Sequence, residues 1–277
     1  GTLWPLFAEM FWDRKLSVGA PFFNMAFTPF MVLLGLIMPI GSTLAWKRGK
    51  LGRAMYQMRY AFALALALAL LVWVMQTGRS LMGPIGLFLG AWMVFGAAID
   101  IWMRAGRKWG RIFRIPRADW GKSIAHGGLG VTMFGIAGLM AWQSEDIRVA
   151  HLNEPFTVGA FELELTGVNQ VRGPNYFSTM GDVILRTKGA QIAVMHPEKR
   201  NYPVAKMPTT EAAIDYRFLR DVYVVIGDQQ EGGGWTLRTY VKPLANWIWG
   251  GVLLMALGGF LSLTDRRFRV AAGASKR

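Results

Sequence analysis

The chain has 277 residues, of which 53% are hydrophobic, including 12 Trp and 17 Phe, yet its formal net charge is +14. This apolar content exceeds what a soluble globular domain usually carries, so the composition favours a membrane protein. Because the chain contains no Cys, a disulfide framework and thiol chemistry of its own are excluded.

The basic residues are concentrated in three short segments. Lys47–Arg59, Arg104–Lys122 and Asp265–Arg277 hold 5, 7 and 5 of the 31 Lys and Arg, with two acidic residues among them. By contrast, Gln143–Asn246 carries 11 basic and 12 acidic residues. Basic residues confined to short loops between apolar runs follow the positive-inside rule of membrane proteins. They do not form a nucleic-acid-binding surface, and we expect no nucleic-acid partner.

Five apolar runs are long enough to cross a lipid bilayer as helices. The predicted spans are residues 21–46, 60–75, 82–102, 123–142 and 244–263. They define a helical membrane region over residues 1–142, a domain over residues 143–243, a last span, and a basic tail over residues 264–277. The second span contains the run ALALALALLVWVM, which favours a helix because Ala and Leu are both apolar and both strong helix formers.

The orientation follows from the alternation of the five spans. All three basic segments fall on one side, which the positive-inside rule assigns to the cytoplasm. The residues before the first span, the short turn Gln76–Ser80 and all of Gln143–Asn246 then lie outside.

The outer domain is expected to be all β. Residues 156–168, 182–187, 190–196, 220–228 and 235–243 alternate apolar and polar positions between Gly, Pro and Asn residues. Five or six short strands over this length predict a small antiparallel barrel or sandwich. The sequence GDQQEGGGW is interpreted as a hairpin loop, because its glycines connect two strands and open no helix. The fold class is therefore a polytopic α-helical membrane protein with a small all-β extracytoplasmic domain.

His126 is the ionisable residue that stands out within a span, in the sequence AHGGLG. An ionisable side chain inside a membrane is costly and commonly marks a functional site. The glycines that follow, among them Gly128 and Gly130, leave the backbone beside the imidazole uncluttered, which gives room for a flat ligand such as haem. Alternatively, Gly128 and Thr132 form a small-xxx-small pair for helix packing while His126 bonds a neighbouring helix. The span alone leaves both interpretations open.

Three other ionisable residues have a simpler interpretation. Asp100 lies one turn before Arg104, and we expect it to pair there or to reach the interface and not to relay protons. His151 and His196, in the outer domain, have no Cys, Asp or Glu at metal-ligand spacing and are expected to be surface residues. No nucleophile, base and orienting group can be assembled from the sequence, nor any nucleotide-binding motif.

Three stretches together resemble one protein family. They are GTLWPLFAEMFWDRKLSVGAPFFN at the start, AVMHPEKRNYPVAKMPTTEAAID followed by RDVYVVIG, and WIWGGVLLMALGGFLSLTDRRFR in the last span. These stretches are similar to the C-terminal portion of the bacterial cytochrome c-type biogenesis family CcmF. PEKR with its TTEAAID continuation is a specific motif, and the resemblance covers essentially the whole chain.

The resemblance implies a role in the system I haem lyase of the bacterial inner membrane. In this family, haem from a haem chaperone is joined through its vinyl groups to the CxxCH thiols of apocytochrome c. The apocytochrome is presented by a thiol-redox subunit of the same pathway. The family also holds a permanent haem b within the membrane, and AHGGLG is similar to the motif of one axial ligand. The resemblance therefore implies that His126 binds the haem iron.

Several features of the family are missing from this chain. The tryptophan-rich segment, the two outer-face histidines that hold incoming haem and the second axial histidine of haem b would all lie upstream of Gly1. We therefore expect a piece of a longer protein, or a split subunit, that is inactive without its N-terminal half. His151 and His196 match none of the missing positions.

Two other classes of function remain alternatives at this stage. One is half of a transporter or permease with a substrate-capture domain, which predicts broken helices and polar groups near the midplane of the bilayer. The other is a membrane-anchored scaffold whose outer domain docks partner proteins. The sequence leaves open which cytochromes are matured and which residues of the outer domain contact partners.

Overall fold

The computed structural model describes residues 3–14, 19–44, 49–76 and 80–265. Expectations for residues 45–48, 77–79 and 266–277 lie outside the described residues; they concern the end of the first span, parts of two loops and most of the basic tail. The chain forms two compact units, which are described separately below. The helical unit comprises residues 1–71, 85–133 and 250–277, and the sandwich unit comprises residues 72–84 and 134–249.

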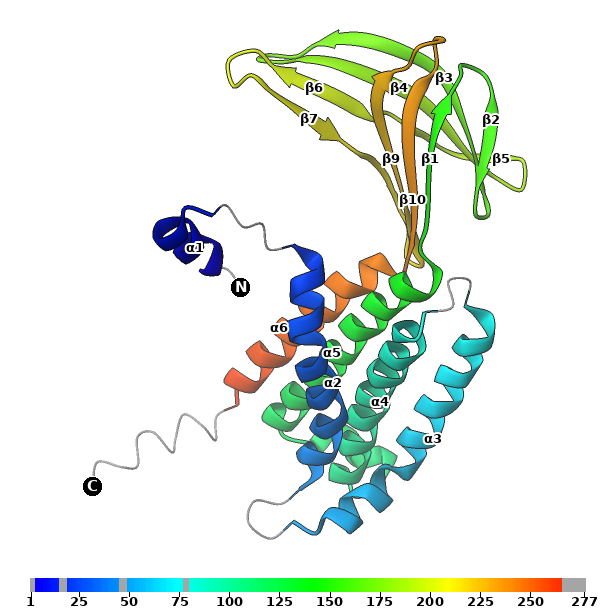
Figure 1. Ribbon diagram of the computed structural model, residues 1–277. Coiled ribbons are helices and arrows are strands. Elements are labelled where there is room, and N and C mark those ends of the chain that lie inside the picture. Colours follow the sequence, from blue (N-terminus) through cyan, green and yellow to red (C-terminus); the bar gives the residue numbers. More distant parts are fainter. Residues whose placement is uncertain (1–2, 15–18, 45–48, 77–79, 266–277) are drawn as a thin grey trace. The chain divides into compact units, whose positions relative to one another are not determined.

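Among the described residues, five helices are long and apolar enough to cross a membrane. They are α2 (Ala20–Thr43), α3 (Leu51–Met75), α4 (Met82–Arg104), α5 (Arg117–Trp142) and α6 (Ala245–Leu263) (Figure 1). A short helix α1 (Trp4–Trp12) and a 3₁₀ helix η1 (Trp109–Arg114) were not expected from the sequence. Each is too short and too aromatic to show a clear helical period.

Two of the spans begin earlier than their apolar runs. Helix α3 begins at Leu51 and not at Tyr60, and α5 begins at Arg117 and not at Ser123. At the start of α3 the Arg59 guanidinium lies over the rings of Tyr56 and Tyr60, with distances of 3.8 and 4.3 Å to the centroids. Basic side chains of this kind extend a helix beyond the hydrocarbon region, so hydropathy alone underestimates its length.

The repetitive run in α3 places small side chains on one face of the helix and large side chains on another. Ala61, Ala65 and Ala69 are buried in the helical unit, whereas Leu66 and Leu70 are exposed. The buried alanines recur every four residues, which is a helical spacing and confirms that the alternating run is no strand. Ala61 and Ala65 pack in one cluster with Trp92 of α4, whose indole N–H donates to the carbonyl oxygen of Leu36 in α2 at 3.1 Å.

The sandwich unit contains two curled antiparallel sheets (Figure 1). One sheet has the strand order β1 (Ser144–Ala150), β10 (Trp235–Pro243), β9 (Arg220–Gln229) and β8 (Ala213–Tyr216). The other has the order β2 (Pro155–Val158), β3 (Phe161–Arg172), β4 (Phe177–Thr187), β6 (Glu198–Tyr202) and β7 (Met207–Glu211), and β5 (Ala190–Met195) also pairs with β4. The core between them is mainly aliphatic and includes Leu163, Leu165, Leu185, Ile226 and Leu237, all fully buried.

Several strands differ from the expectation. The single strand expected over residues 156–168 is a hairpin, because Gly159, with φ of +59°, turns the chain between β2 and β3. Strands β1, β6 and β7 are not predicted from the sequence, since they are too polar to show the apolar alternation, and β8, with the sequence AIDY, is too short to show it. The expected hairpin in GDQQEGGGW is confirmed by the pairing of β9 with β10.

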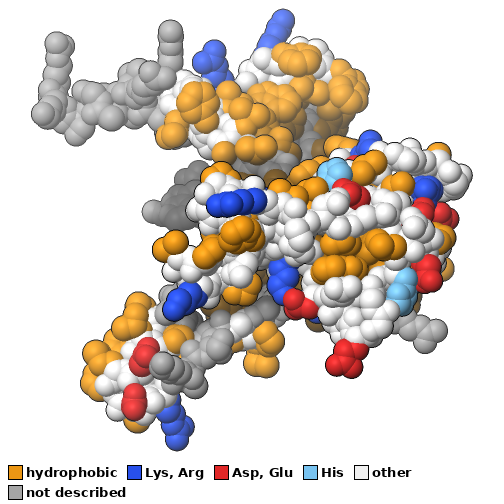
Figure 2. Space-filling model, turned by 90° about the horizontal axis from the view of Figure 1, so that it is seen from above, with side chains coloured by type: hydrophobic (Ala, Val, Ile, Leu, Met, Phe, Trp, Pro, Cys, Tyr) orange, Lys and Arg blue, Asp and Glu red, His pale blue; other side chains and the backbone are white. Residues whose placement is uncertain are grey.

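The outer surface of the sandwich carries charges of both signs. Seen from above in Figure 2, basic and acidic side chains are interspersed with hydrophobic ones. This mixture matches the near-neutral charge of Gln143–Asn246 and differs from the predominantly basic segments of the helical unit.

Candidate functional site

Helix α5 packs so closely on two neighbours that several of its positions require glycine. A Cβ built on Gly128 would lie 2.7 Å from the carbonyl oxygen of Gly251 in α6, and one built on Gly130 would lie 2.8 Å from that of Gly90 in α4. These distances leave no room for a side chain, so the helices meet backbone to backbone. The expectation that Gly128 and Gly130 leave space for a ligand is therefore wrong. The alternative is confirmed for Gly128, which serves helix packing, and Gly130 packs on α4 in the same way.

His126 lies on a different face of α5, which is directed toward α2. One turn before it, the Lys122 ammonium donates to the carbonyl oxygen of Ser42 in α2 at 3.3 Å. Two turns after it, the side chain of Met133 approaches Gly35 of α2. Residues four and seven positions apart share one helix face. Lys122, His126 and Met133 therefore lie along one face of α5, which we call the α2-facing stripe.

The His126 imidazole is half-buried, and no hydrogen bond joins it to another residue in the described part of the chain. The charged groups that act on it are Lys122 and Asp100. A nitrogen without a hydrogen-bond partner is free to bind a metal ion, which is what haem iron requires of an axial imidazole. The residues present therefore fit one axial position of a haem.

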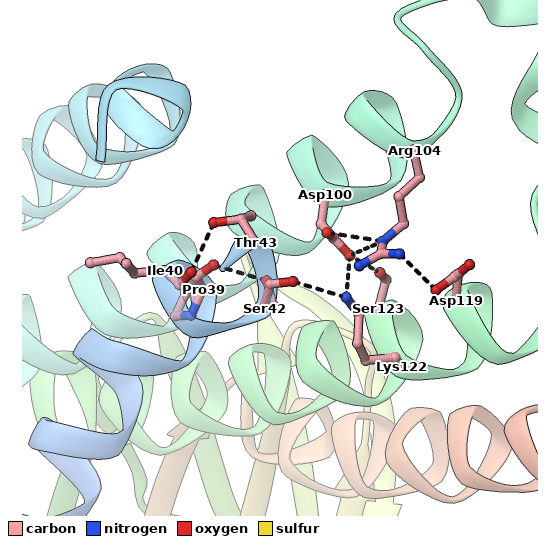
Figure 3. A network of polar contacts seen from close by, with 9 residues as sticks. All are labelled: Pro39, Ile40, Ser42, Thr43, Asp100, Arg104, Asp119, Lys122 and Ser123. Atoms are coloured by element: carbon pink, nitrogen blue, oxygen red, sulfur yellow. Dashed lines mark hydrogen bonds and ion pairs between the residues drawn. The ribbon is translucent and has the colours of Figure 1, made fainter. Parts of the chain in front are cut away.

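Beside this stripe, a buried carboxylate gathers two cations at the end of α4 (Figure 3). Asp100 is only 3% exposed, and its carboxylate lies 2.8 Å from the Lys122 ammonium and 3.1 Å from Arg104 Nε. The Ser123 hydroxyl donates to the same carboxylate at 2.9 Å, and Arg104 also pairs with Asp119 at 2.8 Å. Two carboxylates and two cations make this cluster electrically neutral, as a buried site requires.

The expected pairing of Asp100 with Arg104 is confirmed, but the sequence did not reveal its other partners. Lys122 and Ser123 lie more than 20 residues further along the chain, on α5. Lys122 itself could be selected from the sequence, because it stands one helical turn before His126 at the start of α5. Its position along the chain does not identify Asp100 as its partner.

The first turn of α5 is held from the other side by α6. The Asp265 carboxylate, just beyond the end of α6, accepts a hydrogen bond from the backbone N–H of Ala118 at 2.9 Å and is 6% exposed. A carboxylate at a helix N-terminus satisfies an unpaired N–H and is favoured by the helix dipole. The turn that leads to His126 is thus fixed by α2, α4 and α6 together.

The two other histidines lie in the sandwich unit. His196 Nδ1 lies 2.8 Å from a carboxylate oxygen of Asp182, and His151 is exposed. Among the described residues, no group of three His, Cys, Asp or Glu is placed to hold a metal ion. Neither histidine has surroundings comparable to those of His126.

The PEKR motif forms a cross-link between strands. The Glu198 carboxylate accepts hydrogen bonds from the buried Ser178 hydroxyl at 2.9 Å and from Arg200 Nε at 2.8 Å. Lys199 pairs with Asp228 of β9 at 2.5 Å. The hydrogen bond from Arg200 holds the pKa of Glu198 below its usual value, although partial burial acts in the opposite direction. The motif therefore ties β4, β6 and β9 together.

Comparison with known proteins gives consistent matches along the chain. Residues 141–243 match the family described as CcmF C-terminal beta-sandwich. Cytochrome c-type biogenesis protein ccl1 of Rhodobacter capsulatus is 59% identical over 276 residues, covering 100% of this chain and 42% of the relative. CcmF of Escherichia coli is 34% identical over 278 residues, with the same two coverages.

A solved structure named Cytochrome c Heme Lyase CcmF has the same fold. It matches with a TM-score of 0.74 at 22% identity, over 95% of this chain and 42% of that protein. The chain thus spans about two fifths of the length of these relatives. The five candidate spans among its described residues make it a multi-pass membrane protein. From end to end, this chain is similar to a C-terminal portion of the CcmF family of cytochrome c-type biogenesis proteins.

Proposed function

We propose that this chain is the C-terminal part of a membrane haem lyase that matures c-type cytochromes. The proposal is supported by similarity along the whole chain to proteins named for cytochrome c biogenesis, and by the fold of a named haem lyase. The activity belongs to the longer protein, because this chain covers only 42% of its relatives. The substrates would be haem from a haem chaperone and the CxxCH thiols of apocytochrome c, presented by a thiol-redox subunit.

Within that assembly, His126 would be one axial ligand of a haem b. The observation that carries this assignment is the half-buried imidazole on the α2-facing stripe, which has no hydrogen bond to another described residue. A bound haem would supply one-electron redox chemistry within the membrane. The chain itself would hold the iron through a His126 nitrogen and keep the helix turn in place through the Asp100 cluster. The second axial ligand would come from the N-terminal half.

The charge pattern supports an orientation in the bacterial inner membrane. The basic segments, including residues 104–122, would face the cytoplasm, and the sandwich would lie in the periplasm. An outer surface with interspersed charges suits the docking of partner proteins there.

The test is the absorption spectrum of the purified complex. The chain is coexpressed with the upstream half of the protein, purified in detergent, and reduced-minus-oxidised spectra are recorded. We expect His126→Ala to remove most of the b-type haem signal and His196→Ala, an exposed control, to keep it. Thermal unfolding in detergent shows whether His126→Ala remains folded.

Two results would contradict the assignment. A full b-type signal from folded His126→Ala would exclude the histidine as ligand. If His126→Ala also leaves cytochrome maturation intact while deletion of residues 143–243 abolishes partner capture, the chain is a docking scaffold and no part of the haem site.

A further inference from the structure

A groove of about 600 Å³ opens on the helical unit. It lies between the last turns of α4, the first turns of α5 and the 3₁₀ helix η1. Three tryptophans, Trp102, Trp109 and Trp120, line it, and the rest of its wall is aliphatic apart from Ser123. The Ser123 hydroxyl is already donated to Asp100. The groove has the size of pockets that bind organic ligands, and its wall suits an apolar chain.

The groove is built into the fold by contacts beneath and beside it. The Trp120 indole N–H donates to the carbonyl oxygen of Ile112 at 3.2 Å, which fixes η1 to the start of α5. The rings of Trp102 and Trp109 are in contact, with centroids 4.9 Å apart. Below them, Ile101 and Ile115 are buried in a common cluster. These contacts tie η1 to both helices, so the groove does not depend on a bound molecule for its walls.

The segment that closes the groove is strongly basic. Its five cations are exposed, and none forms an ion pair with another described residue; they are Arg107, Lys108, Arg111, Arg114 and Arg117. Asp119, the acidic residue between Arg107 and Lys122, is paired with Arg104, and the nearby Asp265 carboxylate accepts a hydrogen bond from the backbone N–H of Ala118. An apolar groove next to unpaired cations matches a ligand with an acyl chain and an anionic headgroup.

We propose that this groove binds one anionic phospholipid, with an acyl chain along the three tryptophans and its phosphate held by the cations of residues 107–117. Arg forms charge-assisted, bidentate hydrogen bonds with phosphate, which a zwitterionic lipid satisfies less well because its own ammonium group competes. Basic pockets between membrane helices are a known recognition mode for anionic headgroups. The ligand would stabilise η1 against α4 and α5.

The experiment measures lipid binding to the full chain in detergent. Dioleoyl phosphatidylglycerol and dioleoyl phosphatidylcholine, which share acyl chains, are titrated and the bound lipid is counted by native mass spectrometry. We expect tighter binding of phosphatidylglycerol. The double variant Arg111→Gln/Arg114→Gln should weaken that binding about 30-fold, since each cation contributes about 1 kcal/mol at a membrane surface, and should leave phosphatidylcholine unchanged.

Two further variants separate charge from shape. Ala98→Trp places a large side chain at an exposed position that lines the groove, and it should weaken both lipids. Lys50→Gln/Arg53→Gln removes two exposed cations from another basic segment and should change neither. Thermal unfolding checks that each variant is folded.

The proposal would be overturned by equal binding of the two lipids, or by an equal loss in the Lys50/Arg53 control. Competition by inorganic phosphate alone would show an anion site without a lipid. Loss of bound lipid on coexpression with the upstream half would show that the groove is an interface between helices.

Discussion

In the helical unit, the buried carboxylate of Asp100 gathers two cations into one cluster, whereas the sandwich unit distributes its ion pairs over the strands. The Asp100 carboxylate, 3% exposed, has two cations and a hydroxyl as partners. In the sandwich, pairs such as Glu145 with Arg238 at 3.6 Å lie at the surface. The difference reflects the solvent: an unpaired charge in hydrocarbon costs several kcal/mol, while water screens a surface pair to about 0–1 kcal/mol.

The two units also differ in how they pack. Helices α4, α5 and α6 approach backbone to backbone at glycines such as Gly128 and Gly251, whereas the sandwich fills the space between its sheets with aliphatic side chains such as Leu165 and Ile226. Lipid tails are as apolar as Leu, so apolar burial drives helix association weakly and close contact becomes decisive. Between sheets in water, the hydrophobic effect itself is sufficient.

The largest effect is expected from Asp100→Ala in the helical unit. Removing the carboxylate leaves Lys122 and Arg104 without their shared partner, at a cost of about 3 kcal/mol. Thermal unfolding of the chain in detergent, with Asp119→Asn as the control, measures this. Because Asp119 is more exposed, its variant should cost less than about 1 kcal/mol. Equal losses of stability in the two variants would show that burial does not determine how much each carboxylate contributes to stability.

The packing difference is tested by two adjacent glycines of α5. Gly128→Ala would place a Cβ 2.7 Å from a backbone carbonyl of α6 and should destabilise the helical unit by about 2 kcal/mol. A Cβ on Gly127 would make only an ordinary contact, 3.6 Å from Ala97 Cβ. Gly127→Ala should therefore be neutral, or stabilising by up to about 1 kcal/mol because Ala favours the helix. If thermal unfolding in detergent shows a stability change of the same sign for both variants, close packing at Gly128 is refuted.

The smallest effect is expected in the sandwich, from Glu198→Gln. The pKa of Glu198 is lowered mainly by its hydrogen bond from Arg200, so the ionised form stabilises the fold above the usual pKa. This stability is fully present above the usual pKa of Glu and is lost as the pH falls through the lowered pKa. We expect the variant to lose about 0.5 kcal/mol at pH 7 and to show a flatter acid dependence.

Circular dichroism melts at pH 7 and pH 4 measure that difference. Glu145→Gln, in an exposed pair, is the control and should leave the acid dependence unchanged. An acid dependence of Glu198→Gln identical to that of the unmodified chain would show that the PEKR cross-link does not couple to protonation.

Much of the fold could be predicted because its signals are local. An apolar run of about 20 residues dictates a membrane helix, and α4 and α6 begin within one residue of the prediction. The strands with clear apolar alternation were found, but β6 and β7 were not, since they pair through backbone hydrogen bonds while their side chains carry the charges of PEKR and TTE. His126 could be selected because a histidine in a span is rare.

By itself, the sequence determined the five spans, the β character of the segment between the last two, and the identity of the residues that cannot lie in lipid without a partner. Hydropathy, period and charge are properties of neighbouring residues, so they can be read along the chain. Only the tertiary structure decided which partners those residues take: Lys122 and Ser123 for Asp100, and Asp265 for the first turn of α5. It also assigned Gly128 and Gly130 to helix packing. These contacts join residues up to 147 positions apart, and their geometry depends on how the helices meet in space.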